Sequence, residues 1–346
     1  MSHPSDPAET AAAGQTQGPT TPPSNPSPRW SEGFDAHHPA ANGHRAALRS
    51  IARVVEDTAP LQDESEAREG ILELLREHRP LVITGAGVST DSGIPDYRGP
   101  EGSLRRHRPM TYQEFSGDPV ARHRYWARSY VGWREMDGAK PNPAHRILGE
   151  WTARGLTAGI VTQNVDGLHA AAGAEVGLPP ERLITLHGDL ARVVCLRCGA
   201  VEDRPALDAR LEAANPGYLE AVAIDPDAVN PDGDVTLDDH WVERFRMVGC
   251  LSCGSDKLKP DVVYFGENIP RERREAAEAL LEDAGSVLAV GSSLAVMSGF
   301  KFVLMAERRG LPVGLVNLGP TRADPKAQWR WRAPVAEALT WLDERL

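Results

Sequence analysis

The chain has 346 residues and a formal net charge of −11, a length that allows one large domain or two smaller ones with a substantial core. The acidic balance and the lack of a basic stripe argue against general nucleic-acid binding. No apolar run approaches the length of a transmembrane helix. The N-terminus lacks the basic start and apolar segment of a secretory signal, and its few arginines argue against a mitochondrial transit peptide. We therefore expect a soluble, cytoplasmic protein that binds neither nucleic acid nor membrane.

The first 42 residues are rich in Pro, Ser, Thr, Ala and Gly and contain few large apolar residues. Such a composition buries too little apolar surface to offset the cost of ordering the chain, so we expect 1–42 to be a disordered tail. The next regular element is expected to be a helix over Glu66–His78, where leucine and isoleucine recur at helical spacing shortly before Pro80.

A short apolar run in the segment 81–98, LVITGAGVSTDSGIPDYR, breaks into Gly85-Ala86-Gly87. A buried strand that ends in glycines and opens into a helix brings backbone N–H groups close to a phosphate, and glycine leaves room for the ligand. Thr90 stands where the dehydrogenase fingerprint has its third glycine, and the Gly-Lys-Ser/Thr of a phosphate loop is absent. The segment predicts a nucleotide diphosphate site, but not an ordinary dehydrogenase, kinase or ATPase.

The loop after this segment carries the basic run Arg-Arg-His-Arg at 105–108. Charge runs usually lie on solvated faces, which is the interpretation that we favour; the alternative is a cation that meets a phosphate or an acidic substrate. An aromatic helix over Tyr112–Trp133 follows and is expected to belong to the core. Another helix is expected to begin at Pro143.

Polar residues follow two further apolar runs, where strands are expected to end. Gln163, Asn164 and Asp166 come after the run 158–161, and His187 comes after the run 183–186. In open α/β sheets ligands bind at the carboxyl ends of strands, where such groups can hold ribose hydroxyls or act as a general base. Considered singly, Asn164 and Asp166 could equally shape a turn and cap a helix, and a structural role is the commoner one for a lone histidine.

All four cysteines lie in two C-x-x-C pairs, Cys195 with Cys198 and Cys250 with Cys253. Four thiolates make a closed tetrahedral zinc site, so we expect one structural zinc ion; a thioredoxin-like redox site needs only one pair. The segment between the pairs is long and acidic, and its stretch 230–239 faintly resembles a calcium loop. Ala228 fills the first ligand position of that loop and no glutamate closes it, so we do not favour calcium.

The last third of the chain predicts a second set of strands and helices. Strands are expected at 260–267, which would return to the main sheet, at 286–290 and at 312–316, and helices at 272–283, around 300–304 and from about 333. Gly291, Ser292 and Asn317 follow the last two of these strands. Small or amide residues thus recur at several strand ends, which favours a nucleotide site over turn chemistry alone.

These segments together resemble the sirtuin family of NAD-dependent protein deacylases. GAGVSTDSGIPDYR, TQNVDGLH, LHGDL, the paired C-x-x-C motifs, PDVVYFGE, GSSLAV and VNLG occur in the family's order from about Glu66 to the end. Tyr97, the segment GSLRRHRP and the long insertion resemble the class II branch. The resemblance implies an α/β fold: a Rossmann-like, doubly wound parallel sheet with a smaller zinc-binding module and a helical insertion. The expected division is a tail at 1–42, a cofactor domain at 43–190 and 259–346 with the insertion at about 101–142, and a zinc module at 191–258.

The resemblance also implies roles for individual residues. His187 would be the catalytic base, and the four cysteines would bind zinc. The implied contacts of NAD are Gly85, Ala86, Gly87, Ser89 and Thr90 at the pyrophosphate, Asp96, Tyr97 and Arg98 over the nicotinamide ribose, Gln163, Asn164 and Asp166 at that ribose and the nicotinamide pocket, Gly291, Ser292 and Ser293 at ribose or phosphate, Asn317, Leu318 and Gly319 at the adenosine, and Val335 near the adenine. An acyl-lysine peptide would pair as a strand with Val262, Val263, Phe265 and Gly266.

The implied activity is transfer of the acyl group of acyl-lysine proteins to the ADP-ribose of NAD, with release of nicotinamide. Three alternatives stay open: mono-ADP-ribosyl transfer to a protein, lipoamidase-type activity, and an NAD-sensing binding module without catalysis. The preferred acyl group does not follow from the sequence. The basic run 105–108 and the long insertion are candidates for the lining of its pocket.

Overall fold

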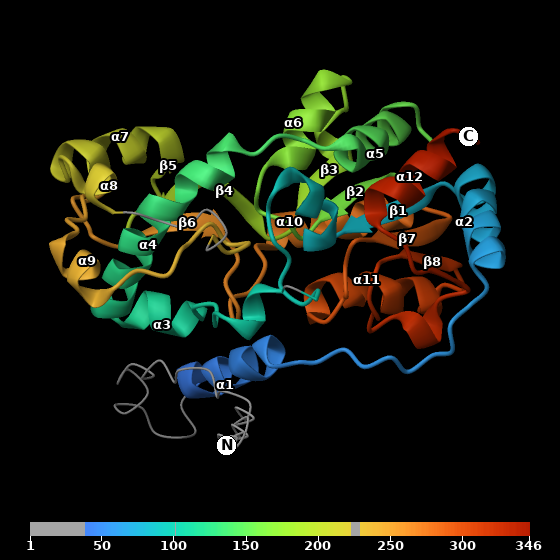
Figure 1. Cartoon of the computed structure of the whole chain (residues 1–346), viewed down its shortest axis with the longest axis horizontal. Coiled ribbons are helices and arrows are strands. Elements are labelled where there is room, and N and C mark those ends of the chain that lie inside the picture. Colours follow the sequence, from blue (N-terminus) through green and yellow to red (C-terminus); the bar gives the residue numbers. More distant parts are fainter. Residues whose placement is uncertain (1–38, 101, 223–228) are drawn as a thin grey trace, which may run out of the picture.

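The computed structural model describes residues 39–100, 102–222 and 229–346. They form a six-stranded sheet with helices on both faces and a separate three-stranded sheet (Figure 1). The strands are β1 (Pro80–Thr84), β2 (Gly159–Thr162), β3 (Leu183–Thr185), β4 (Gly188–Cys195), β5 (Val201–Asp203), β6 (Leu258–Val262), β7 (Ser286–Val290), β8 (Val313–Val316) and β9 (Trp329–Trp331). The helices are α1 (Pro39–Ile51), α2 (Glu64–His78), α3 (Tyr112–Gly117), α4 (Pro119–Gly138), α5 (Pro143–Ala153), α6 (Leu168–Glu175), α7 (Arg204–Ala214), α8 (Tyr218–Ala221), α9 (Asp239–Arg244), α10 (Arg271–Glu282), α11 (Met297–Arg308) and α12 (Val335–Asp343).

The large sheet is entirely parallel and has the strand order β3-β2-β1-β7-β8-β9. This is the doubly wound order of dinucleotide-binding folds, in which successive strands are added first on one side of β1 and then on the other. The order reverses between β1 and β7, where Thr84 lies opposite Val290. The Rossmann-like fold class expected from the sequence is confirmed, and its switch point lies beside the glycine segment.

Helices cover both faces of this sheet because the side chains of a strand alternate between the faces. Val82 packs in a core with α2, α5 and α12, whereas Leu81 and Ile83 pack with α10 and α11. Figure 1 shows α12 and α11 on opposite sides of β7. All five residues of β1 are buried, as its uninterrupted apolar run predicts for a central parallel strand.

The small sheet is antiparallel, with the order β5-β4-β6. The expectation that the strand at 260–267 returns to the main sheet is wrong, because β6 pairs with β4 from Cys195 opposite Leu258 to Gly188 opposite Val262. The strands of the small sheet therefore extend past both predicted ends of the zinc module, 191 and 258. The sequence of β6, LKPDV, is not specific for either sheet, and only the pairing distinguishes the two.

The aromatic stripe belongs to the core, as expected, but it is carried by two helices. Asp118 separates α3 from α4; its side chain accepts a hydrogen bond from the Val120 N–H at 2.8 Å, and Pro119 is the first residue of α4. This is an ordinary N-terminal cap. Trp126 and Tyr130 of α4 are fully buried in the core between the small sheet and α7 to α9.

Helix α1 begins at Pro39, within the segment that the sequence predicts to be a disordered tail. Its buried residues include Ala41, Ala47 and Ile51, which lie on one face at helical spacing. The prediction of a disordered tail over 1–42 is therefore wrong for residues 39–42, which are helical. Residues 1–38 lie outside the described residues. Within the described ranges, none of the helices combines the length and hydrophobicity that a membrane crossing requires.

Candidate active site

Two glycine loops meet where β1 and β7 end. A Cβ on Gly87 would lie 2.9 Å from the carbonyl oxygen of Gly291, and a Cβ on Gly85 would lie 2.7 Å from the Cβ of Ser292. Gly291 itself has φ +60°, a conformation that favours glycine. From the sequence, glycine is expected here because it leaves room for a ligand and permits positive φ. The structure adds a further reason, because the two loops could not approach each other with larger residues.

A hydrogen-bonded network joins the residues that follow β1 and β2. Ser89 Oγ donates to Asp166 Oδ2 at 2.7 Å, and Asn164 Nδ2 donates to Ser89 Oγ at 3.0 Å and to the Gly85 carbonyl at 3.1 Å. Burial raises the pKa of Asp166, and its hydrogen bond with Ser89 lowers it in part. The sequence-predicted residues Ser89, Asn164 and Asp166 thus form one cluster of hydroxyl, amide and carboxylate groups.

Gln163 connects this network to the loop after β7. Its Nε2 donates to Ser292 Oγ at 2.8 Å and to the Thr84 carbonyl at 3.1 Å. Its backbone carbonyl accepts a hydrogen bond from Nδ1 of His187 at 2.9 Å. The ends of β1, β2, β3 and β7 are therefore linked through one side chain and its own carbonyl.

The tautomer of His187 follows from its two partners. A carbonyl oxygen only accepts, so Nδ1 carries the hydrogen that it donates to Gln163, and Nε2 is left as an acceptor. Nε2 lies 2.8 Å from Ser298 Oγ, a hydroxyl that can donate. Burial of the ring lowers the pKa of His187 to about 4, although the hydrogen bond to the Gln163 carbonyl works in the opposite direction. The residue is a neutral base at physiological pH, with its free nitrogen facing a hydroxyl group.

Asp96 and Arg98, predicted to lie over the nicotinamide ribose, make hydrogen bonds to the backbone of the protein itself. Asp96 Oδ1 accepts from the Gly99 N–H at 2.7 Å and so shapes a turn. The ring of Tyr97 lies edge-on to the ring of Phe265, with centroids 6.4 Å apart, and burial raises the pKa of its hydroxyl well above the ordinary value. Arg98 donates to backbone carbonyls at the end of α1.

The remaining predicted cofactor residues lie in the loops after β1, β7 and β8 and at the start of α12. Asn317 Nδ2 donates to the Gly319 carbonyl at 2.7 Å, which shapes the loop after β8, while Leu318 is 58% exposed. Val335 is only 8% exposed and packs in the core shared by α2 and α5. Its expected place near an adenine stays a prediction. Thr90 Oγ1 donates to the carbonyl of Gly87, and Ala86 and Ser293 lie within the two glycine loops.

The segment predicted to pair with a peptide runs from the small sheet past His187. The N–H of Val263 donates to the His187 carbonyl at 2.7 Å, so this segment is fixed beside the imidazole from the end of β6 onward. The carbonyl of Phe265 accepts from the Tyr112 N–H at 2.9 Å, and the Gly266 carbonyl accepts from Gln113 Nε2 at 3.0 Å. The two ends of the segment are therefore held by β4 and by α3.

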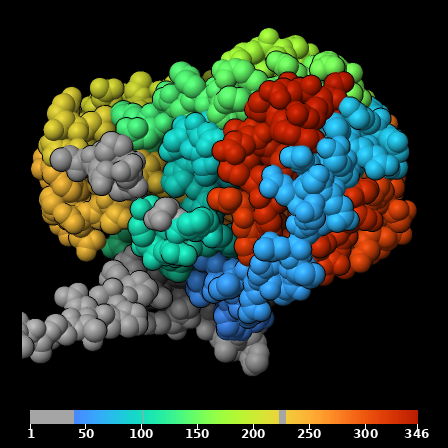
Figure 2. Space-filling model, turned by 45° about the vertical axis from the view of Figure 1, so that its right-hand side comes forward, coloured from blue at the N-terminus to red at the C-terminus, as the bar shows by residue number. Residues whose placement is uncertain are grey.

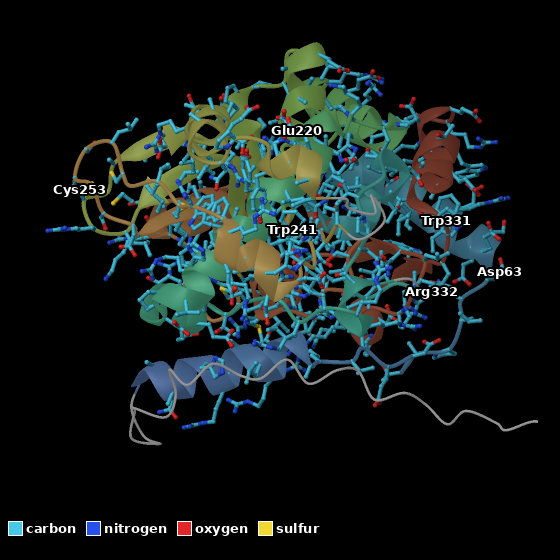
Figure 3. All side chains as sticks on the ribbon, turned by 60° about the vertical axis from the view of Figure 1, so that its left-hand side comes forward. Asp63, Glu220, Trp241, Cys253, Trp331 and Arg332 are labelled. Atoms are coloured by element: carbon cyan, nitrogen blue, oxygen red, sulfur yellow. The ribbon has the colours of Figure 1, made fainter. Side chains whose placement is uncertain are left out.

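The four cysteine sulfurs form one cluster, remote from these loops. All four Sγ atoms lie within 4.8 Å of one another, with Cys195 to Cys253 at 3.7 Å and Cys198 to Cys250 at 3.8 Å. A tetrahedron of sulfurs about 2.3 Å from a zinc ion has edges of about 3.8 Å, so the cluster fits the ion. Figure 3 shows Cys253 at one end of the molecule and Trp331 at the other. The predicted structural zinc site is therefore supported by its geometry.

The structure gives no support to the calcium interpretation of 230–239. Asp234 accepts from Asn230 Nδ2 at 2.7 Å and pairs with the guanidinium of Arg128 at 3.0 Å, so its carboxylate is neutralised by the protein itself. Across the part of the chain that is described, the cysteine cluster is the one group of three or more His, Cys, Asp and Glu side chains arranged to hold a metal ion. Ala228 lies outside the described residues.

Two buried histidines near the network were missed by the sequence analysis. His145 forms a capping box with Asn142 and lies 3.4 Å from Ser89 Oγ through Nε2. His169 Nε2 lies 3.0 Å from Thr84 Oγ1, and the two imidazole rings are 4.7 Å apart. The Asn-Pro-x-His sequence at the start of α5 is the one local signal for His145.

These histidines make the stability of the fold depend on pH. Burial lowers the pKa of His145 from 6.5 to about 4 and lowers the pKa of His169 well below its ordinary value. The unfolded chain therefore takes up protons first, so stability is full above pH 6.5 and falls as the pH drops below it; for His145 the loss between pH 6.5 and 4 is up to about 3 kcal/mol. Urea unfolding at pH 7.5, 6.0 and 5.0 measures this slope, and His145→Asn is expected to flatten it. Parallel slopes for the two proteins would contradict the assignment.

Comparisons with known proteins identify the family. The Sir2 family model matches residues 85–298. A relative from Corynebacterium efficiens, named NAD-dependent protein deacetylase 1, is 58% identical over 277 residues, 80% of this chain and 96% of the relative. A relative from Bos taurus, named NAD-dependent protein lipoamidase sirtuin-4, mitochondrial, is 38% identical over 312 residues, 89% of this chain and 95% of the relative.

A solved structure of Sir2 with a deacetylated p53 peptide and 3′-O-acetyl ADP ribose is 29% identical, with a TM-score of 0.61 over 80% of this chain and 97% of that chain. The family match spans the glycine segment, the polar network, His187 and the four cysteines, which are the parts that the fold brings together at its two sites. The chain belongs to the Sir2 family, the sirtuins.

Proposed function

We propose that this chain is an NAD-dependent protein lysine deacylase, which moves the acyl group of acyl-lysine to ADP-ribose and releases nicotinamide. The observation that supports this most is the placement of His187. The imidazole is neutral, its tautomer is fixed, and its free Nε2 faces the hydroxyl of Ser298. Its Nδ1 donates to the carbonyl of Gln163, which precedes Asn164 in the chain, so the ring lies next to the network of Ser89, Asn164 and Asp166. A base of this kind suits removal of a proton from a sugar hydroxyl.

The residues at the switch point fit a dinucleotide. The glycine loops bring the backbone after β1 close to the backbone after β7, and the hydroxyl, amide and carboxylate of Ser89, Asn164 and Asp166 are groups that can hold ribose hydroxyls. NAD, when bound, supplies the ADP-ribose that accepts the acyl group and the nicotinamide that leaves. The carboxylate of Asp166 would orient ribose there, and the ring of Tyr97 would exclude water from the reacting face.

His187 performs the acid–base step in this proposal. Its Nε2 takes the proton of a ribose hydroxyl, and the Nδ1–H bond to the Gln163 carbonyl stabilises the resulting imidazolium in a fixed orientation. The acyl-lysine peptide would lie along Val262, Val263, Phe265 and Gly266, beside this imidazole. Four thiolates leave a zinc ion no open position, so zinc would brace the small sheet rather than take part in the reaction.

The branch of the family, the division into domains and the cellular location are proposed from the sequence. We propose a member of the class II branch, from Tyr97 and the long acidic insertion. We propose a cofactor unit of 43–190 with 259–346 and a zinc module of 191–258, with the small sheet extending into both neighbours. The cytoplasm is the proposed place of action, because paired cysteines that bind metal suit a reducing compartment.

A panel of acyl-lysine peptides tests the function directly. With NAD, we expect nicotinamide and acyl-ADP-ribose in equal amounts by mass spectrometry for at least one acyl group, and a lipoyl peptide belongs in the panel because a relative is named a lipoamidase. ADP-ribose attached to protein without deacylation would instead indicate a transferase. Binding of NAD without nicotinamide release would indicate a sensing module.

The same panel tests the basic run for a role in acyl selection. Arg108 is paired with Glu114 at 2.7 Å, and His107 lies near Arg128, so Arg105 and Arg106 are its exposed members without these contacts. If Arg106 binds acidic acyl groups, Arg106→Ala is expected to lower kcat/KM for an acidic acyl peptide about tenfold, a loss of about 1.4 kcal/mol in transition-state binding. The kcat/KM for an acetyl peptide should stay unchanged. Arg105→Ala is the matched control. An unchanged ratio of acidic to neutral rates would remove Arg106 from the site.

A further inference from the structure

Helix α1 lies apart from the other N-terminal elements and against the substrate side of the molecule. A linker at 53–63 without helix or strand connects it to α2. Figure 1 shows α1 beside α3, on the other side of the molecule from α12, and Figure 2 shows the same blue helix and linker along its lower edge. The position of α1 beside α3 is fixed by two sets of contacts.

The first contact is made by Arg98. Its guanidinium donates to the carbonyls of Ser50 at 3.2 Å, Ile51 at 3.5 Å and Arg53 at 3.4 Å. The last carbonyls of a helix have no partner within the helix, and a guanidinium with several donors stabilises them. Arg98 follows Tyr97 in the loop that is proposed to cover the nicotinamide ribose. The end of α1 therefore fixes the position of that loop.

The second contact reaches the segment that is proposed to bind peptide. His44 Nδ1 lies 3.0 Å from Thr111 Oγ1, and Thr111 forms a bridge with Phe265. Further along α1, the Cβ of Ala47 would lie 2.9 Å from a Cβ placed on Gly266, so helix and segment are in close contact. One short helix thus touches both the cofactor loop and the peptide segment.

We propose that α1 is a positioning element for the deacylation site, with Arg98 as its positioning residue, so that docking of α1 and binding of NAD and acyl peptide favour one another. The inference rests on the proposed function. Because coupling between two binding events is reciprocal, bound NAD stabilises the docked helix to the same degree that the docked helix favours NAD. Residues 39–63 are then part of the substrate site and not an independent extension.

A pair of neighbouring alanines provides a matched test in the full chain. Ala47 is 2% exposed and faces Gly266, whereas Ala46 is exposed one position earlier on the same helix. Ala47→Glu places a carboxylate in the interface and is expected to raise KM for NAD and for the acyl peptide at least about fivefold, with a smaller effect on kcat. Ala46→Glu is expected to behave as the wild type.

Arg98 variants separate positioning from a general loss of structure. Arg98→Gln is expected to raise KM for NAD as Ala47→Glu does, Arg98→Lys to recover part of the loss, and the double variant Ala47→Glu with Arg98→Gln to be no worse than either single variant. Additive effects of the two, or wild-type KM values in Ala47→Glu, would overturn the proposal.

A readout that does not depend on turnover is trypsin cleavage after Arg53, which is exposed in the linker. Saturating NAD is expected to slow this cleavage in the wild type and in Ala46→Glu, and not in Arg98→Gln. Equal protection in all three would overturn the proposal even if Ala47→Glu failed to fold. Absence of nicotinamide release from the wild type would instead contradict the proposed function, while NAD-dependent protection would still support the coupling.

Discussion

His187→Ala is expected to reduce acyl-peptide-dependent turnover of NAD by about 10²- to 10⁴-fold, the contribution typical of a positioned general base. The reason is the geometry of the ring: Nδ1 is held by the Gln163 carbonyl, and Nε2 is the acceptor that faces a hydroxyl. Alanine removes the acceptor but keeps the backbone carbonyl that binds Val263. The measurement is the rate of acyl-ADP-ribose formation, with NAD affinity determined separately.

Ser298→Ala is the matched control for this prediction. It removes the hydroxyl partner of Nε2 and leaves the base in place, so we expect turnover within about tenfold of the wild type, because only one neutral hydrogen bond is lost. NAD affinity and the unfolding midpoint of both variants should remain near those of the wild type. Full turnover in His187→Ala would contradict the role of this imidazole and, with it, the mechanism.

Removal of zinc is expected to have the largest effect on stability. Structural zinc sites contribute on the order of 10 kcal/mol, which is comparable to the whole stability of a typical domain. Cys198→Ser removes one of four sulfurs that lie within 4.8 Å of one another, so we expect the small sheet to unfold and bound zinc to fall well below one ion per chain. Metal analysis and circular dichroism measure the two effects.

Leu196→Ser is a control in the same loop. Leu196 is 36% exposed between the first two cysteines, so its replacement alters the loop without altering the ligand set. This variant should retain one zinc ion and the melting temperature of the wild type to within a few degrees. A Cys198→Ser protein with full zinc content and unchanged melting would show that the four sulfurs do not share an ion.

The parts that could be predicted from the sequence are those in which the signal is local. The apolar run at 81–83 followed by Gly85 specifies a buried strand and a tight loop within a few residues, and the two cysteine pairs specify their own metal site. His187 was predicted from its place after the apolar run 183–186 together with the family motif LHGDL, whereas its partner Ser298 lies 111 residues further along the chain. No spacing rule relates those two positions.

The two wrong predictions, the sheet to which β6 belongs and the end of the disordered tail, have the same physical origin. The sequence of the strand β6, LKPDV, is not specific for either sheet, and its pairing with β4 joins residues 63 to 74 positions apart in the chain. Helix α1 buries mainly small alanines, so its composition resembles that of the tail before it, and its end is contacted by Arg98, 47 residues away from Ile51. Contacts between distant segments decided both cases.

Strand β4 has Gly188, next to His187, at its first residue and the metal ligand Cys195 at its last. Eight extended residues span about 26 Å, and β6 follows the same path until Val263 binds the carbonyl of His187. Loss of the zinc ion would therefore displace the imidazole of His187 through the strand. The distance between the two sites is too long for the charge of the ion to act on the imidazole directly. Oxidants that attack the thiolates would then inactivate the enzyme without contacting the loops that are proposed to hold NAD.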